Sequence, residues 1–194
     1  MDANEEKPEA AERLEAIAER LAFKSRFVML FGEINHTAAR AACTRLIALA
    51  EESEAPIQML ISSPGGHVES GDAIHDVIRF VRAPVTTVGT GWVASAGTHV
   101  FLAASRERRL CLPNTRFMIH QPGGGAGGPA TDIAIQAKEI LRTRERIAKV
   151  IARQTGQALA KVLGDMERDF WMSAEEAIEY GLVSKIIESS RELR

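Results

Sequence analysis

One serine lies among small residues where a predicted strand, Val85 to Val88, turns into an apolar segment, Gly91-Trp92-Val93-Ala94-Ser95-Ala96-Gly97. The apolar run from Gly89 to Ala104 predicts a buried core helix that is too short to span a bilayer. The first turn of a helix has unpaired backbone N–H groups and a favourable dipole, so an oxyanion forming there would be stabilised. Ser95 is therefore a candidate nucleophile, and a plain packing or capping role is the alternative.

A nucleophilic serine needs a general base, and the base needs a group that orients it. His120 is the best candidate of the five histidines, because the run from Arg116 to Ile119 predicts a short buried strand that ends there, before a glycine-rich loop. His67 and His99 lie near the glycine motifs, so their position does not exclude them as the base. His36 and His75 are expected to be surface or boundary residues.

Asp169 is the best candidate for the orienting carboxylate. It lies at the edge of the aromatic cluster Phe170-Trp171-Met172, where we expect partial shelter from solvent. Ser173 and Glu176 follow with the three-residue spacing of a capping box, which predicts the start of a helix. The alternative is a surface acid or an ion-pair partner of Arg168.

The motif Ser63-Pro64-Gly65-Gly66 follows the predicted strand Ile57 to Ile61 and precedes a predicted helix, Val68 to Val81. Two adjacent glycines let the backbone turn sharply and bring an N–H close to a ligand. A plain strand-to-helix turn is the alternative. Together with the Ser95 segment, this motif would supply the second of the two donors that an oxyanion hole requires.

These motifs, in this order, resemble the proteolytic subunit of the Clp protease, a serine peptidase family of the crotonase-like superfamily. The resemblance runs from about Phe27 to Ile187. Its further pieces are Leu112-Pro113-Asn114, Met118-Ile119-His120-Gln121-Pro122, Ala130-Thr131-Asp132-Ile133, Glu167-Arg168-Asp169 and Glu179-Tyr180-Gly181-Leu182-Val183.

The resemblance implies a catalytic triad with Ser95 as nucleophile, His120 as general base and Asp169 as the acid that orients it. The backbone N–H groups of Gly66 and Ala96 would then be the oxyanion donors. It also implies heptameric rings stacked as a tetradecamer, polypeptide substrates and an AAA+ unfoldase partner that uses ATP. This chain itself would bind no cofactor and no metal.

Composition limits the classes of protein that fit. A chain of 194 residues with 45% hydrophobic residues and no internal repeat predicts one α/β domain. A formal net charge of −2 and a sequence pI of about 6.2 argue against a nucleic-acid partner. Cys43 and Cys111 are expected to be buried, reduced thiols, which fits a reducing cytoplasm. The segment from Met1 to Glu12 is acidic and lacks the apolar core of a signal peptide. We therefore expect a cytoplasmic protein without a membrane segment.

Predicted strands and helices alternate in βαβ order, and a long helix follows from Asp132 to about Arg153. The resemblance implies that this helix and the loop before it, about 121–153, form a protruding handle where two rings meet. Packing of the whole helix on its own core is the alternative. We expect a peptidase domain over residues 25–190 and a divergent helical segment over residues 1–24.

The chain departs from the family pattern at its N-terminal segment and at the positions of Gln58 and Leu60, where family members usually carry aromatic residues that dock the unfoldase. The loop Gly123 to Pro129 is also unusually rich in glycine. Two other functions therefore stay open: a catalytically silent subunit of a mixed ring, and a crotonase-like acyl-CoA enzyme that shares the oxyanion hole.

Overall fold

The computed structural model describes residues 6–125 and 127–193, and within them seven strands form one mostly parallel sheet. The strands are β1 (Phe27–Phe31), β2 (Ile57–Ser63), β3 (Val85–Ala94), β4 (Arg109–Cys111), β5 (Arg116–Ile119), β6 (Phe170–Met172) and β7 (Lys185–Ile186). The helices are α1 (Glu6–Lys24), α2 (His36–Glu52), α3 (Val68–Phe80), α4 (Ala96–Phe101), α5 (Ala130–Thr155), α6 (Leu159–Asp165) and α7 (Ala174–Tyr180). The predicted α/β fold of βαβ units is confirmed.

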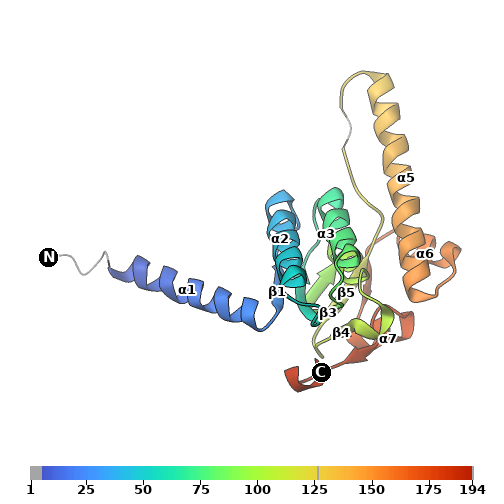
Figure 1. The fold of residues 1–194 in the computed structure, drawn as a ribbon. Coiled ribbons are helices and arrows are strands. Elements are labelled where there is room, and N and C mark those ends of the chain that lie inside the picture. Colours follow the sequence, from blue (N-terminus) through green and yellow to red (C-terminus); the bar gives the residue numbers. More distant parts are fainter. Residues whose placement is uncertain (1–5, 126, 194) are drawn as a thin grey trace.

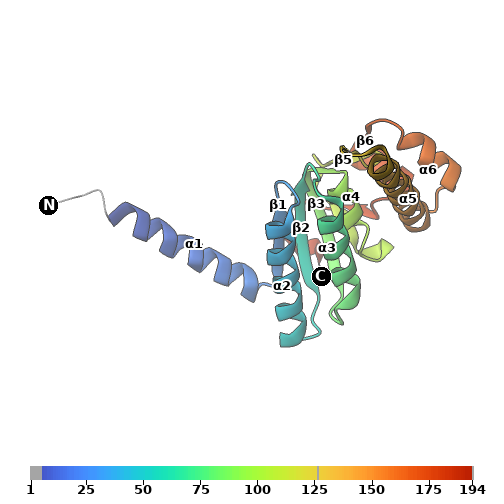
Figure 2. The same ribbon diagram turned by 90° about the horizontal axis from the view of Figure 1, so that it is seen from above.

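The sheet runs in the order β1-β2-β3-β4-β7, and these neighbours pair in parallel. Helices α2 and α3 lie side by side along the β1–β3 part of the sheet (Figures 1 and 2). Alternate residues of β2 are buried, and the apolar stripes of the two helices close over them through Leu46, Leu49 and Ile74. This layer holds the carboxyl ends of β2 and β3 in fixed positions.

Strand β3 changes its partner half-way along. Thr87–Gly89 pairs with β4, whereas Trp92–Ala94 pairs with β5. Gly91 has a φ of +60°, a backbone conformation that side chains rarely adopt, and it lies at the change. The fork places the ends of β3 and β5 side by side.

The predicted helix over Gly89 to Ala104 is wrong for its first part. The segment from Gly89 to Ala94 continues β3, and α4 is only six residues long. Gly89 packs tightly on Phe117 and Thr115, so its place in the sheet is fixed by long-range contacts. A short apolar run rich in small residues fits a buried helix and a central strand equally well, and such contacts decide between them.

Helix α5 protrudes from the domain as the predicted handle (Figure 1). Its buried residues all lie in the last two turns, beginning at Ala148, whereas Ile133, Ile135 and Leu141 of the outer part are exposed. The outer half of the helix therefore has no core of its own in the single chain, and packing of the whole helix on its own domain is excluded.

Helix α1 extends away from the domain on the other side (Figures 1 and 2), with Leu14, Ile17 and Leu21 exposed.

The predicted capping box is present at the start of α7. Ser173 Oγ accepts a hydrogen bond from the Glu176 amide, and the Glu176 carboxylate accepts one from the Ser173 amide. Across the described residues, the helices are too short or too polar to cross a bilayer.

His75 is buried, with 5% of its surface exposed, so its predicted place at the surface or boundary is wrong. Burial is the main cause that lowers the pKa of His75 to about 4. The neighbouring charges of His99 and Arg79 lower this pKa further, and Asp76 raises it. As the pH falls from about 6.5 towards 4, the unfolded chain takes up a proton at this position and the folded chain does not.

The free energy of unfolding should therefore fall by about 2 kcal/mol through His75 between about pH 7 and pH 5. Urea titrations at the two pH values measure this loss, which should be smaller in His75→Phe. The variant of the exposed histidine, His36→Gln, is the matched control and should keep the pH dependence of the wild type. Equal losses in wild type and His75→Phe would contradict the prediction.

Candidate active site

Ser95 occupies the tight turn between β3 and α4, with φ of +56° and ψ of −121°. This region is strained for a residue with a side chain. A similar strained turn from strand to helix exposes the nucleophile in α/β-hydrolases. Bonds from the Ser95 amide to the Met118 carbonyl, at 2.9 Å, and from the His99 amide to the Ser95 carbonyl, at 3.1 Å, hold the turn from both sides.

The pairing of β5 with β6 determines where the other two candidates lie. The two strands are antiparallel, with Ile119 opposite Phe170. His120 follows β5 and Asp169 precedes β6, so the ladder leads directly to the next pair. Two residues that are far apart in the sequence therefore meet at one end of a short antiparallel ladder.

The three side chains form a continuous chain of hydrogen bonds. His120 Nε2 lies 2.7 Å from Ser95 Oγ, and His120 Nδ1 lies 2.9 Å from Asp169 Oδ1. With the proton on Nδ1 donated to the carboxylate, the lone pair of Nε2 faces the serine hydroxyl. The carboxylate can hold this tautomer, and the imidazole can accept the serine proton.

The Asp169 side chain is 62% exposed in the single chain. The expectation that the aromatic cluster shelters this carboxylate is therefore wrong for the chain alone. Trp171 instead stacks on Trp92 of β3 and lies under the guanidinium of Arg116 of β5, so the contacts of its ring are with neighbouring strands.

The glycine motif lies against the Ser95 turn. A Cβ placed on Gly65 would lie 2.6 Å from Ser95 Cβ, so only glycine permits this approach. A parallel bridge joins Gly66 to Ile34 and uses the Gly65 carbonyl and the His67 amide, so the Gly66 amide is directed away from Ile34.

Ala96 is the first residue of α4, and amides of a first helical turn have no partner within the helix. The two predicted oxyanion donors, Gly66 and Ala96, thus come from two loops that touch beside Ser95. The structure brings together all five predicted site residues.

Gly66→Ala should destabilise the fold by about 2 to 5 kcal/mol and remove most activity. Gly66 has a φ of +143°, and an added Cβ would lie 2.3 Å from the Ile34 carbonyl oxygen. Thermal unfolding and peptide hydrolysis measure the two effects. Gly164→Ala in α6 is the matched control, because its Cβ would meet nothing within 4 Å, and alanine there should be neutral or slightly stabilising. Similar unfolding temperatures for the two variants would contradict the prediction.

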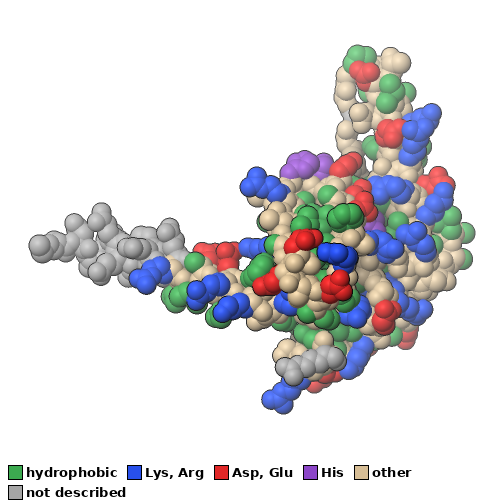
Figure 3. Space-filling view, in the orientation of Figure 1, with side chains coloured by type: hydrophobic (Ala, Val, Ile, Leu, Met, Phe, Trp, Pro, Cys, Tyr) green, Lys and Arg blue, Asp and Glu red, His purple; other side chains and the backbone are tan. Residues whose placement is uncertain are grey.

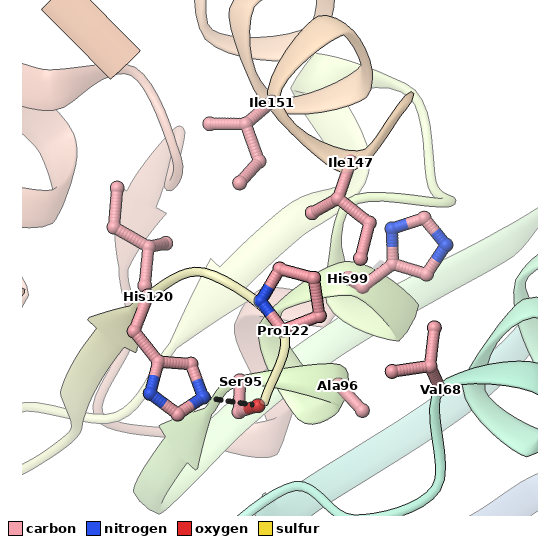
Figure 4. A pocket seen from close by; sticks show the side chains of 9 residues that line it. Val68, Ser95, Ala96, His99, His120, Pro122, Ile147 and Ile151 are labelled. Carbon is pink, nitrogen blue, oxygen red and sulfur yellow. Dashed lines mark hydrogen bonds between the residues drawn. The ribbon is translucent and has the colours of Figure 1, made fainter. Parts of the chain in front are cut away.

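A pocket opens beside Ser95 and His120, with mostly apolar walls (Figure 4). Its lining residues are Val68, Ser95, Ala96, His99, Ile119, His120, Pro122, Ile147 and Ile151. Ile147 and Ile151 come from the base of α5, opposite the α4 residues Ala96 and His99. The walls of the pocket present an apolar surface next to the serine hydroxyl.

The sequence pattern does not predict which residues line this pocket. Ile147 and Ile151 belong to the apolar stripe predicted for the long helix, but nothing in that pattern says which part of the stripe faces Ser95. For His99, its position four residues after Ser95 is a usable signal, since residues with that spacing share one helix face.

The family model described as Clp protease matches residues 9–190. The chain belongs to the Clp protease family. This membership makes the chain a peptidase and confirms the prediction of a Clp proteolytic subunit. The family match begins within α1, so it includes most of that helix.

Clp protease relatives of this chain are similar over most of its length. "ATP-dependent Clp protease proteolytic subunit 3" of Rhizobium etli is 54% identical over 171 residues, which are 88% of each chain. "ATP-dependent Clp protease proteolytic subunit 2" of Treponema pallidum is 45% identical over 193 residues, 99% of this chain and 97% of the relative. A solved structure of a ClpP1 mutant from Listeria monocytogenes shares 48% identity, with a TM-score of 0.85 over 92% of this chain and 99% of that chain. The alternative of an acyl-CoA enzyme has no support among these relatives.

Proposed function

We propose that this Clp protease chain is a serine endopeptidase whose nucleophile is Ser95. The hydrogen-bonded chain from Ser95 Oγ through His120 to Asp169 is the observation that carries the proposal. His120 Nε2 takes the hydroxyl proton as Oγ attacks a peptide carbonyl, and Asp169 stabilises the imidazolium that forms. His120 then gives the proton to the leaving amine, and water activated by the same imidazole releases the acyl group.

The amides of Gly66 and Ala96 are proposed to bind the oxyanion of the tetrahedral intermediate. Their support is the close approach of the glycine motif to the Ser95 turn and the position of Ala96 at the start of α4. Two fixed backbone donors at a developing negative charge account for a large part of catalysis by serine hydrolases.

The assembly is also part of the proposal: two heptameric rings of this chain, stacked through the handles, enclose the active sites. The exposed apolar residues Ile133, Ile135 and Leu141 on the outer part of α5 support it, because such a surface is usually covered by a partner. A closed chamber would admit only unfolded chains and short peptides.

The names of the relatives support an ATP-dependent Clp partner, so we propose an AAA+ unfoldase that feeds substrates and consumes the ATP. The chain itself would need no cofactor for the chemistry of the triad. The free thiols of Cys43 and Cys111 support the reducing cytoplasm as the compartment.

A fluorophosphonate probe tests the proposal, because it reacts only with an activated serine. Mass spectrometry of the assembled protein should find the adduct on Ser95 in the wild type and none in His120→Ala. An assembled ring without an adduct at Ser95 would contradict the proposal and favour a silent subunit of a mixed ring.

A further inference from the structure

A polar cluster with two buried histidines lies where three helices meet beside the pocket. It consists of Asp72 and His75 on α3, His99 on α4 and Arg146 on α5. Both histidines are 5% exposed, and their rings stack with centroids 4.5 Å apart. The proposed mechanism gives no role to any of the four.

Asp72 is the centre of this cluster. Its Oδ1 lies 3.0 Å from His99 Nε2, and both of its oxygens accept bonds of 2.7 Å from the two terminal nitrogens of Arg146. A two-bond pair between guanidinium and carboxylate fixes orientation as well as distance. Asp72 therefore ties α4 and α5 to each other through α3.

The charges of the cluster depend on one another. Burial alone would raise the pKa of Asp72, but the bonds from His99 and Arg146 hold that pKa well below its usual range. A partly buried carboxylate with this set of donors stays ionised, and losing one donor removes part of what compensates its lost solvation. The three groups therefore act as a unit.

The location of the cluster gives it a consequence for substrate binding. His99 lies one turn after Ser95 on α4, and Arg146 directly precedes Ile147 on α5. Figure 4 shows His99 between Val68 and Ile147 at the side of the pocket. The contact from Asp72 to Arg146 is made where α5 first reaches the domain, just before its first buried residue, Ala148.

We infer that Asp72, His99 and Arg146 are positioning residues that set the distance between the two walls of the substrate pocket. Asp72 anchors the α4 wall through His99 and the α5 wall through Arg146. This role lies outside the triad and rests on the proposed function only in that the pocket receives substrate. The ion pair therefore controls how tightly substrate is held while the reaction of Ser95 itself stays unaffected.

The test compares Asp72→Asn and Arg146→Gln with wild type in peptide hydrolysis, fluorophosphonate labelling of Ser95 and hydrogen exchange of the α5 amides. We expect KM to rise by about 3- to 10-fold, because the Arg146 side chain is half exposed, and kcat to stay within about twofold. The labelling rate should also be unchanged, and the amides around Ile147 and Ile151 should exchange faster. Arg146→Lys keeps the charge but loses the two-bond geometry, so its KM should lie between those of wild type and Arg146→Gln.

Arg142→Gln is the matched control. Basic side chains lie along α5 (Figure 3). Arg142 lies one turn before Arg146 and pairs with Glu139 of the same helix, so its loss should change none of the readouts. An unchanged KM in both test variants, or a labelling rate that falls in parallel with kcat, would overturn the inference. If Ser95 of the wild type is not labelled, the proposed serine mechanism fails. The hydrogen-exchange data still test the positioning role in that case, because unchanged exchange of the α5 amides in Asp72→Asn overturns the inference.

Discussion

Ser95→Ala is expected to lower kcat/KM for peptide hydrolysis by about 10⁴- to 10⁶-fold. The loss is this large because Ser95 Oγ is the atom that would form the acyl bond, and the hydroxyl removed lies 2.7 Å from its base. Alanine keeps the Ser95 amide that binds the Met118 carbonyl, so the turn between β3 and α4 should survive. Hydrolysis of a fluorogenic peptide by the assembled protein measures the effect.

Assembly by size-exclusion chromatography should be the same for Ser95→Ala and wild type, which separates loss of chemistry from loss of fold. Ser25→Ala is the matched control, because Ser25 is exposed in the turn between α1 and β1. Hydrolysis by Ser95→Ala at even one hundredth of the wild-type rate would exclude Ser95 as the nucleophile.

Asp169→Asn is expected to lower kcat by about 10²- to 10⁴-fold. The carboxylate accepts a hydrogen bond from His120 Nδ1–H, and this bond keeps Nε2 free to accept from Ser95. An asparagine can turn its NH₂ group toward Nδ1, and the ring then holds its proton on Nε2, where it cannot act as a base. The exposure of Asp169 allows solvent to replace part of the interaction, so the lower end of the range applies to the single chain.

Single-turnover acylation with an activated ester, followed over pH, measures this effect separately from substrate binding. Asp165→Asn is the matched control, because Asp165 belongs to a different network with Tyr180 and Lys161. A loss of less than about threefold in Asp169→Asn would remove Asp169 from the triad.

The sequence was sufficient to predict residues that the structure brings together, because most of them lie at a recognisable break in pattern. Ser95, His120 and the Gly65-Gly66 pair all come directly after apolar runs that are strands in the structure. Their mutual distances are set by pairing between distant strands, and no local pattern contains that information. Periodicity therefore identified the candidates, and tertiary contacts decided their geometry.

The failures have one physical cause. The strand character of Gly89 to Ala94 depends on packing against β5, and the burial of His75 depends on the stacking of its ring on His99 of α4. Imidazole and glycine are compatible with several environments, so their own residue types do not select one. The exposed fraction of the Asp169 side chain likewise depends on tertiary neighbours, which its residue type does not determine.

The antiparallel ladder of β5 and β6 has a further consequence for the segment between His120 and Asp169. That segment contains the whole handle, yet it leaves and rejoins the sheet at the same rung of the ladder, since Ile119 faces Phe170. In topological terms it is an insert in a hairpin, anchored in the core by Ala148, Ile151 and Val162. Its protruding outer part could be lengthened, shortened or exchanged without moving base and acid apart, whereas deleting one residue inside β6 would shift the ladder by a rung and separate them.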